Sequence, residues 1–528
     1  MHPQGIISQS GTRYIEIEEG GQPRLIPIQS ISSNRRGRSE VLCLERTAGL
    51  LWQSDKKTKD AAKALNEFQP HTVIEHNGWT SPDIYRHPDG EMMLADASQP
   101  MKSLFPQATP QADVPGTLEA WKAEVAEPLT SNRIPILVVC LAFVPLLQLS
   151  ASRPRNLGLQ LVGPQNSGKS MLVQLARSVW GGSLGYAGLP DLLRFEQFAS
   201  DPGRHLWEAF DCFLPIVDFS SFAITETPRL RARKIIPGLR SLSTGGAEGL
   251  IHEARCSYLL VGTESLQEMI GGDSAFAALT DLPVVRIQSD ATHGVLSKLP
   301  DGHDNSLVLM QGLCAAAQRN PGHASKAFVR HIMTEGQSAI HAEIGRLVQL
   351  FYEKCKVDRS DRTVTVVAEQ FGLIYAAGQI AKNAGVLPDE WNIGAAVKRC
   401  YTQYLQDIEP PKPLPPLRER LEALMEDSRI VKVPGAGLKP TASNKEKAEQ
   451  ALGFQKSDSE YRELWLERDR IEQSLPDWEN LKRTDEARSL LKRDGDHLET
   501  KRKVFKRGKQ KRFFVFRLEG DAPTLLDE

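Results

Sequence analysis

Residues 157–181 read LGLQLVGPQNSGKSMLVQLARSVWG, and this stretch decides the fold. It opens with a short apolar run, residues 157–162, that predicts a buried strand. Residues 163–170 then match the phosphate-binding loop G-x-x-x-x-G-K-[ST] at every fixed position. An amphipathic helix follows, because apolar side chains recur at helical spacing at Leu172, Val173, Leu175, Ala176 and Val179. A strand before the loop and a helix after it predict an α/β fold that binds a nucleoside triphosphate.

The loop supplies the predicted nucleotide site. Its glycines let successive backbone N–H groups turn inward around an anion, and the helix N-terminus adds partial positive charge. Lys169 is expected to reach the terminal phosphates and Ser170 to hold Mg²⁺, so the expected cofactors are ATP and Mg²⁺. A chance glycine-rich turn is the alternative, which the complete motif and its flanks disfavour. The predicted binding residues are Gly163, Pro164, Gln165, Asn166, Ser167, Gly168, Lys169, Ser170 and Met171.

Three later strands carry further candidates. The apolar run CFLPIV ends at Asp218, where a nucleotide-bound Mg²⁺ is usually held, although a strand-end Asp can also be an ordinary one. The run CSYLLVG ends at Thr263 and Glu264, which suit orientation of the attacking water; capping of a helix by Thr263 is the alternative. Arg286 stands within LPVVRI and has three open interpretations: an arginine finger toward a neighbouring subunit, a side chain that extends its charged end to solvent, or a partner of a carboxylate.

Composition sets limits on the class of protein. The 528 residues carry a net charge of −1, which excludes a globally basic nucleic-acid binder. Seven cysteines without a C-x-x-C pair argue against a disulfide framework or a zinc site. The N-terminus lacks the apolar core of a signal peptide, so a cytoplasmic protein is expected. Residues 134–152 are uncharged and apolar, but they contain two prolines, and we predict a buried core helix and no membrane contact.

Four regions are predicted along the chain. Residues 1–115 form a mixed α+β N-terminal domain with short strands, a turn at residues 88–90 and a Pro-rich linker at 99–116. Residues 116–320 form the P-loop ATPase core. Residues 321–408 form a helical lid, with a strong helix over 364–384. A proline-dense hinge, PPKPLPP, opens the last region, residues 409–528.

The last region is predicted to contain helices over 417–426, 461–473 and 484–493 and then a basic hairpin around residues 507–508, with its second strand at 513–518. Helices followed by a basic hairpin are typical of a winged-helix-like domain, whose wing lies on DNA phosphates. Eight of the twelve residues 501–512 are Lys or Arg. A solvated charge run is the alternative. The predicted DNA contacts are Lys501, Arg502, Lys503, Lys506, Arg507, Lys509, Lys511 and Arg512.

Three blocks of sequence resemble a known family. They are the stretch around the phosphate loop, the upstream NGWTSPDIYRHPDG and the downstream AEQFGLIYAAGQIAKNAGVLP. They are similar to the AAA+ P-loop ATPases typified by the replicative helicases of cassette-chromosome and pathogenicity-island elements, which have MCM-like relatives. The resemblance covers about residues 70–405. It implies an AAA+ fold, a hexameric ring and a DNA-translocating motor that serves a mobile element.

The resemblance also implies roles for single residues. Lys169 and Ser170 match the nucleotide site, and Asp218 matches the metal-site acid. Thr263 and Glu264 match the sensor strand, and Arg286 matches the finger of the family.

The chain departs from the family at two places. The family has Asp-Glu at the end of the metal-site strand, and here Phe219 follows the aspartate, so Glu226 or Glu264 would have to polarise the attacking water. Relatives also carry Gly-Lys in the loop before the sensor strand. This chain has STGGAEGLIHEAR there, which leaves His252 and Arg255 as the candidates to contact DNA.

Three functions are compatible with the sequence. The first is an ATP-dependent DNA helicase or translocase that acts as a ring on single-stranded or forked DNA. The second is an ATP-switched DNA-binding assembly factor with slow or no hydrolysis, which Phe219 favours. The third is the ATPase of a replication, defence or transposition complex with a protein partner.

Overall fold

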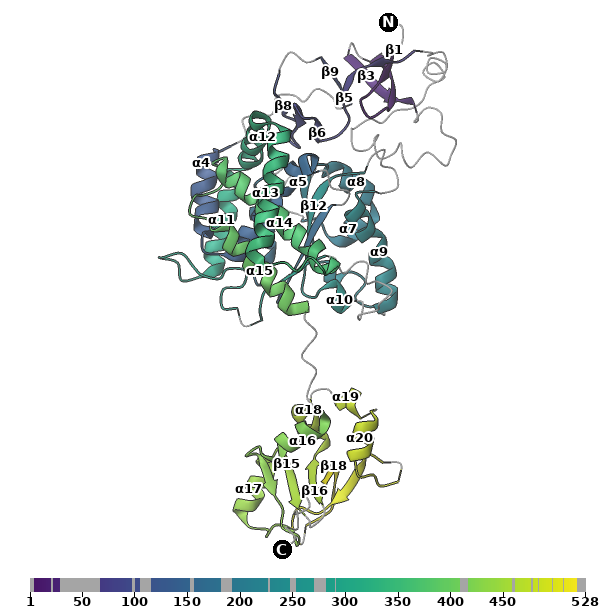
Figure 1. Ribbon diagram of the computed structural model, residues 1–528, viewed down its shortest axis with the longest axis vertical. Coiled ribbons are helices and arrows are strands. Elements are labelled where there is room, and N and C mark those ends of the chain that lie inside the picture. Colours follow the sequence, from purple (N-terminus) through teal and green to yellow (C-terminus); the bar gives the residue numbers. More distant parts are fainter. Residues whose placement is uncertain are drawn as a thin grey trace. The chain divides into compact units, whose positions relative to one another are not determined.

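A computed structural model of the full chain shows two compact units, Met1–Ile408 and Glu409–Glu528 (Figure 1). They divide at the proline-dense segment, and each is described by itself. The structure describes residues 4–19, 22–28, 67–96, 100–104, 115–151, 156–181, 192–226, 228–246, 253–269, 282–289, 291–408, 416–457, 461–475, 478–482, 484–495, 497–506 and 508–519.

The core of the first unit is a parallel four-stranded sheet in the order β11-β12-β10-β13. All four strands were expected from the sequence, and every residue of β10, β11 and β12 is buried, as in parallel sheets covered on both faces. The strand that ends at Asp218 is separated from the phosphate-loop strand by β12. The bounds are β10 Leu157–Val162, β11 Cys212–Val217, β12 Cys256–Gly262 and β13 Val284–Arg286.

Helix α5, Arg133–Ala151, confirms the predicted core helix. It packs against β11, β12 and the phosphate-loop helix α6, Lys169–Arg177. Its length and hydropathy would suit a membrane span, as do those of residues Val364–Asn383, but 89% and 67% of the two windows are buried inside the fold. Both helices are therefore mostly buried, as core helices are.

Long helices complete this core. α14 confirms the predicted helix over 364–384 except for its last residue and packs between α13 and α5, while α15 also lies on α5 (Figure 1). The larger helices are α11 Ser306–Arg319, α12 His323–Glu335, α13 Gln337–Cys355, α14 Arg362–Asn383 and α15 Ile393–Ile408. The shorter ones are α4 Leu118–Trp121, η1 Lys122–Ala126, η2 Glu127–Leu129, α7 Phe195–Ser200, α8 Pro202–Glu208, η3 Phe219–Ser221, α9 Pro228–Thr244 and α10 Leu266–Met269.

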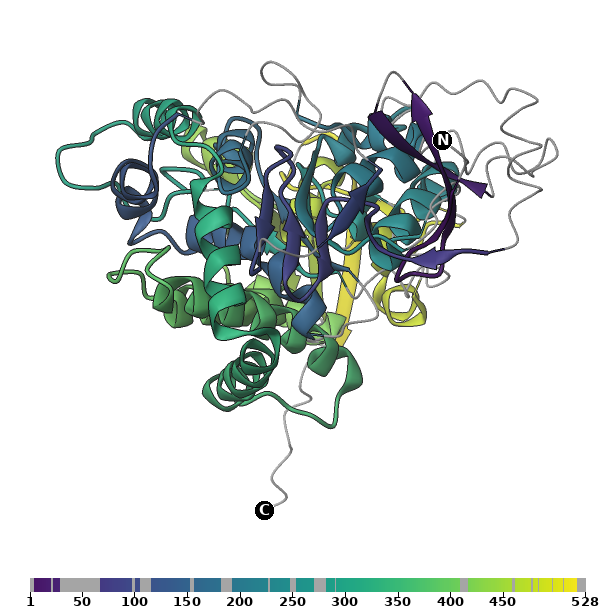
Figure 2. The ribbon, with the colours of Figure 1, turned by 90° about the horizontal axis from the view of Figure 1, so that it is seen from above.

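Short strands make up the N-terminal part of the first unit. One sheet has the order β3-β2-β1-β4, and the short strands β5–β9 lie beside it (Figure 2). The predicted turn at residues 88–90 joins β7 to β8. The predicted linker 99–116 is partly structured, because β9 pairs with β5, and residues 105–114 lie outside the described residues. The bounds are β1 Gln4–Ile7, β2 Arg13–Glu19, β3 Gln22–Pro27, β4 Gln69–Pro70, β5 Thr72–Ile74, β6 Gly78–Ser81, β7 Ile84–Arg86, β8 Met92–Leu94 and β9 Met101–Ser103.

The second unit is a mixed five-stranded sheet in the order β14-β15-β16-β18-β17. One face carries a core with α16, α18, α19 and α20, and the other face carries a smaller core that includes Trp465, Phe513 and Val515. The bounds are β14 Ile430–Lys432, β15 Gly453–Ser457, β16 Tyr461–Leu466, β17 Glu499–Arg502, β18 Lys511–Glu519, α16 Leu417–Met425, α17 Ala442–Gln450, α18 Arg468–Ser474, α19 Trp478–Leu481 and α20 Asp485–Leu490.

The single helix predicted over 461–473 is wrong. Its first half is strand β16, which pairs with β15 and β18, and only its second half is helix α18. Leu464 and Leu466 point into one core of the sheet while Trp465 points into the other, a period of two that requires a strand. The frequent charges in this stretch conceal that short alternation.

The basic hairpin is present and longer than predicted. β17 pairs antiparallel with β18, with Arg502 opposite Lys511, and the predicted second strand over 513–518 lies inside β18. The structure therefore has a five-stranded sheet where the sequence indicated only this hairpin.

Candidate functional site

The central sheet brings the predicted nucleotide-site residues to one edge. Carboxyl ends of parallel strands meet at the same edge of a sheet, and ligands of open α/β sheets bind there. Val162 lies opposite Gly262 on β12 and opposite Arg286 on β13, so the phosphate loop, Thr263 and Arg286 leave the sheet together. Asp218 follows β11 at the same edge.

The phosphate loop needs its glycines. Gly168 has φ +87°, and a Cβ there would also lie 3.1 Å from the Val295 side chain. Asn166 adopts φ +60°, a conformation that asparagine tolerates better than most residues. Gly168 is the N-cap of α6 and provides no side-chain cap, so the first N–H groups of the helix are open to an anion.

Lys169 is folded back onto the loop. Its Nζ donates to the carbonyl oxygen of Gly163 at 2.8 Å and to that of Pro164, and lies 3.2 Å from Ser167 Oγ. Burial lowers the pKa of the Lys169 ammonium, while the Asp218 carboxylate acts in the opposite direction. The ammonium therefore already lies within the curl of the loop, where a phosphate oxygen could replace the carbonyls.

Asp218 and the residue after it have opposite surroundings. Asp218 sits at φ +56° with a side chain that is 57% exposed, and its Oδ2 lies 3.7 Å from Arg194 Nε. Phe219 is 1% exposed, and a Cβ on Gly262 would collide with its ring. The position where a glutamate was expected is thus part of the core, and a carboxylate for the attacking water must come from elsewhere.

Two glutamates could replace it, and they differ in their contacts. Glu226 is paired with Lys234 of α9. Glu264 is exposed at the end of β12, and no hydrogen bond or ion pair involves its carboxylate among the described residues. Its neighbour Thr263 is fixed by Ser220, whose Oγ accepts from the Thr263 backbone N–H at 2.9 Å and lies 3.1 Å from its hydroxyl.

Arg286 has carboxylate partners within its own chain. Its Nη2 lies 3.1 Å from Glu268 Oε1, and its Nε lies 4.0 Å from Asp407 Oδ2. The hydrogen bonds from Ser265 and Arg286 lower the pKa of Glu268 despite burial. The carboxylate pairing that the sequence left open is therefore present, and a finger role for Arg286 requires this pair to open.

Arg255 also has an internal partner. Its Nε and Nη2 donate to the two oxygens of Asp211, which is fully buried, at 2.8 and 2.6 Å. Asp211 also accepts from the backbone N–H of Trp79 in β6 at 2.9 Å. A DNA contact by Arg255 would require breaking this ion pair, so we assign Arg255 a structural role as the partner of Asp211. His252, the other predicted contact in that loop, lies outside the described residues.

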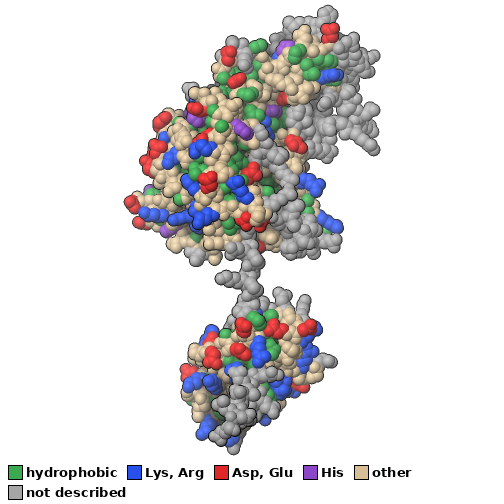
Figure 3. All heavy atoms as spheres, in the orientation of Figure 1, with side chains coloured by type: hydrophobic (Ala, Val, Ile, Leu, Met, Phe, Trp, Pro, Cys, Tyr) green, Lys and Arg blue, Asp and Glu red, His purple; other side chains and the backbone are tan. Residues whose placement is uncertain are grey.

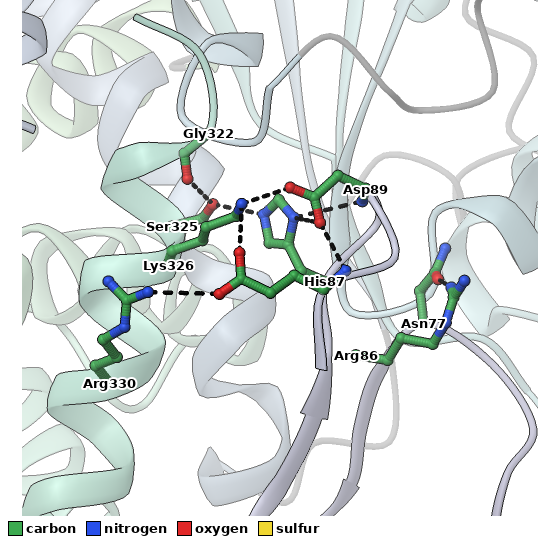
Figure 4. Close-up of polar contacts among 9 residues, drawn as sticks. Asn77, Arg86, His87, Asp89, Gly322, Ser325, Lys326 and Arg330 are labelled. Carbon is green, nitrogen blue, oxygen red and sulfur yellow. Dashed lines mark hydrogen bonds and ion pairs between the residues drawn. The ribbon is translucent and has the colours of Figure 1, made fainter. Parts of the chain in front are cut away.

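A second buried cluster joins the N-terminal strands to α12 (Figure 4). His87 is fully buried, with Nδ1 2.8 Å from Asp89 Oδ1 and Nε2 3.0 Å from Ser325 Oγ. Lys326 of α12 contacts Asp89 and Glu91 at 2.5 and 2.7 Å. The turn predicted at residues 88–90 therefore connects the N-terminal strands to α12.

This cluster predicts a pH effect. Burial lowers the pKa of His87 below its ordinary value, with Asp89 opposing. At acid pH the unfolded chain binds a proton that folded His87 resists, so the stability from this site is complete above about pH 6.5 and falls below it. We expect the loss in melting temperature between pH 7.5 and 5.5 to shrink in His87→Gln. The control is His303→Gln, at an exposed histidine; an equal loss in both variants would contradict the assignment.

The basic hairpin presents most of its predicted DNA contacts to solvent. Arg502 is the exception, because it donates to the buried Glu463 at 3.0 and 3.1 Å and is 17% exposed. Arg507 lies outside the described residues. The exposed side chains are those of Lys501, Lys503, Lys506, Lys509, Lys511 and Arg512.

Two residues of the candidate nucleotide site were not predicted from the sequence. Arg194 forms an isolated β-bridge with Val217 of β11 and thereby lies next to Asp218. Ser220, which follows β11, accepts a hydrogen bond from the backbone N–H of Thr263, which follows the neighbouring strand β12. Neither has a local signal, because a lone Arg in an amphipathic stretch is usually a solvated side chain.

Comparisons with known proteins agree with this architecture at the level of the fold. Residues 44–189, which include the phosphate loop, match a family described as a domain of unknown function, DUF927. A solved structure described as SCCmec type IV Cch, an active helicase, aligns with a TM-score of 0.51 at 14% identity, covering 98% of this chain and 92% of that one. Among curated proteins, no relative matches the chain.

The sheet topology and the residues at its carboxyl edge thus define the fold class of this protein. The chain has a helicase-like mixed α/β fold with a parallel sheet, and the loop that matches the phosphate-binding motif lies at the carboxyl edge of that sheet.

Proposed function

We propose that this protein is an ATP-dependent DNA helicase or translocase, with an AAA+ core, a helical lid over residues 321–408 and a winged-helix-like basic second unit. The observation that carries the proposal is the convergence of Lys169, Asp218 and Thr263 at one edge of the parallel sheet. Charges of both signs at the mouth of a phosphate loop fit phosphoryl transfer, which depends on positioning and electrostatic stabilisation.

The residues present fit ATP and Mg²⁺. The uncapped N-terminus of α6 and the Lys169 ammonium would hold the phosphates. The exposed Ser170 hydroxyl and the Asp218 carboxylate would hold Mg²⁺, which neutralises charge on the phosphates when it is bound. Arg194, 3.7 Å from Asp218, would balance this carboxylate when the site is empty.

Steady-state ATP hydrolysis, with and without single-stranded and forked DNA, tests the proposal. We expect turnover that rises when DNA is added. ATP binding without turnover under every condition would exclude the motor.

Glu264 is the expected base for hydrolysis. Its carboxylate is exposed at the site edge, whereas Glu226 is paired with Lys234. Glu264→Gln should lower the turnover number about 100-fold or more, because a general base contributes roughly that much. Glu226→Gln removes an equal charge and should change it less than about twofold. The reverse pattern would assign the role to Glu226.

The proposed motor works as a cytoplasmic ring, hexameric as the family resemblance implies, on single-stranded or forked DNA of a mobile element. The exposed lysines of the hairpin would lie on DNA phosphates. A finger role for Arg286 fits the ring, since an incoming phosphate of a neighbour would compete with Glu268 for its guanidinium.

Phe219 favours a second candidate. With an aromatic ring buried where a catalytic glutamate was expected, ATP could drive assembly on DNA with slow or no hydrolysis. Such a switch would serve a replication, defence or transposition complex.

A further inference from the structure

Among the described residues, the apolar core on the second face of the sheet in the second unit covers only one end of that face. This small core includes side chains from the sheet and from the segments that cover it: Phe454, Trp465, Phe513 and Val515 on the strands, with Val433 and Val504. Residues two apart on a strand lie on the same face of the sheet. Glu463 stands two residues before Trp465, and Arg517 stands two residues after Val515. Toward the other end of β16 and β18 this face therefore carries charged side chains.

Four cations surround Glu463 on this uncovered end. Lys456 of β15 and Arg517 of β18 are its partners in register on either side. Arg517 Nε lies 3.2 Å from its carboxylate, Lys492 Nζ lies 3.6 Å away, and Arg502 donates two hydrogen bonds. One carboxylate cannot neutralise four cations, so the cluster retains an excess of positive charge.

The carboxylate itself is committed to the fold. Glu463 is buried and also accepts from Trp465 Nε1 at 2.9 Å. Burial alone would raise the pKa of Glu463, but hydrogen bonds from Arg502 and Trp465 outweigh it and lower the pKa to about 2. Burial and the nearby charges of Arg502 and Arg517 lower the pKa of Lys492 despite Glu463, as expected where positive charge is in excess.

An aromatic ring adjoins the cluster. The Arg517 guanidinium lies 4.2 Å from the centroid of the Tyr461 ring, and both side chains are partly exposed. Guanidinium planes and aromatic rings are surfaces on which unpaired bases stack, and Lys and Arg beside them hold the backbone phosphates. Lys and Arg side chains also lie along both flanks of this unit (Figure 3).

We propose that this uncovered end of the sheet, formed by Lys456, Tyr461, Lys492 and Arg517 around Glu463, is a binding site for single-stranded nucleic acid. Lys456 and Lys492 bind phosphates, and the Tyr461–Arg517 pair stacks with a base. The site adjoins the hairpin through Arg502, but its four binding residues are not among the predicted hairpin contacts, and binding there is independent of ATP. The site would bind nucleic acid equally in a motor and in a switch. If the protein does not hydrolyse ATP, the proposed nucleic-acid site is therefore unaffected.

The test is binding of labelled single-stranded and duplex oligonucleotides to the full chain without ATP, measured by fluorescence anisotropy over a range of salt. The variant Lys456→Gln/Lys492→Gln removes two cations and leaves the bonds of Arg502 and Arg517 to Glu463. The control Arg418→Gln/Arg488→Gln removes the same charge from exposed ion pairs on α16 and α20. Melting curves verify that both variants fold.

We expect single-strand affinity to fall about tenfold or more in the test variant and less than about twofold in the control. The slope of log affinity against log salt should fall by roughly 0.7 for each phosphate that the variant no longer binds. Tyr461→Leu should weaken single-strand binding while duplex binding by the hairpin stays the same. Equal losses in the test and control variants, no loss in the test variant, or no binding by the full chain would overturn the site.

Discussion

Replacing Lys169 by alanine is expected to lower ATP turnover about 100-fold or more. The carbonyl oxygens of Gly163 and Pro164 hold the Lys169 ammonium inside the phosphate loop, and the residue is only 9% exposed. The negative charge of Asp218 also acts on this ammonium. Removing one preorganised charge that stabilises a transition state typically costs two to three orders of magnitude in rate. The measurement is steady-state phosphate release at saturating ATP.

Lys382→Ala is the matched control. Lys382 also donates to two backbone carbonyls, those of Asp389 and Trp391, but it lies on α14 outside the loop. Turnover should stay within about twofold in this variant. Equal losses in both variants would mean that Lys169 only supports the fold.

The second large effect concerns stability. Asp211→Ala should lower the free energy of unfolding of the first unit by about 3–5 kcal/mol, because it leaves the Arg255 guanidinium without its buried partner. The variant also removes the acceptor for the Trp79 backbone N–H, which anchors the N-terminal strands to β11. Urea denaturation followed by tryptophan fluorescence measures the loss.

Two comparisons make this prediction specific. Arg204→Ala, which breaks the half-exposed pair with Glu208, should cost less than about 1 kcal/mol. The double variant Asp211→Leu/Arg255→Met should recover much of the lost stability, since apolar pairs often replace buried ion pairs well. No recovery would show that the hydrogen bond to Trp79, and not the ion pair, holds the junction.

The residues of the candidate nucleotide site could be proposed from the sequence because the parts of that site are local. The phosphate loop is contiguous, and short apolar runs such as 157–162 and 256–262 are typical of strands in a covered parallel sheet. Their carboxyl ends then meet by topology, so Asp218 and Thr263 could be placed at the edge of the sheet without coordinates.

What the sequence could not show depends on pairs distant along the chain. Asp211 and Arg255 are 44 residues apart, and neither is unusual by itself. His87 and Ser325 are 238 residues apart. Strand β16 was taken for a helix because its two-residue period spans only six residues, and its pairing with β18 is set by tertiary contacts. The cation cluster around Glu463 follows from that same pairing.

The most direct test of the central claim is strand displacement of a labelled DNA fork by the full chain with ATP and Mg²⁺, with Lys169→Ala as the blank. We expect displacement by the unmodified chain that requires ATP and is abolished in the variant. Tight ATP-dependent binding to the fork with no displacement and no hydrolysis would contradict the motor and leave an ATP-gated DNA-binding assembly.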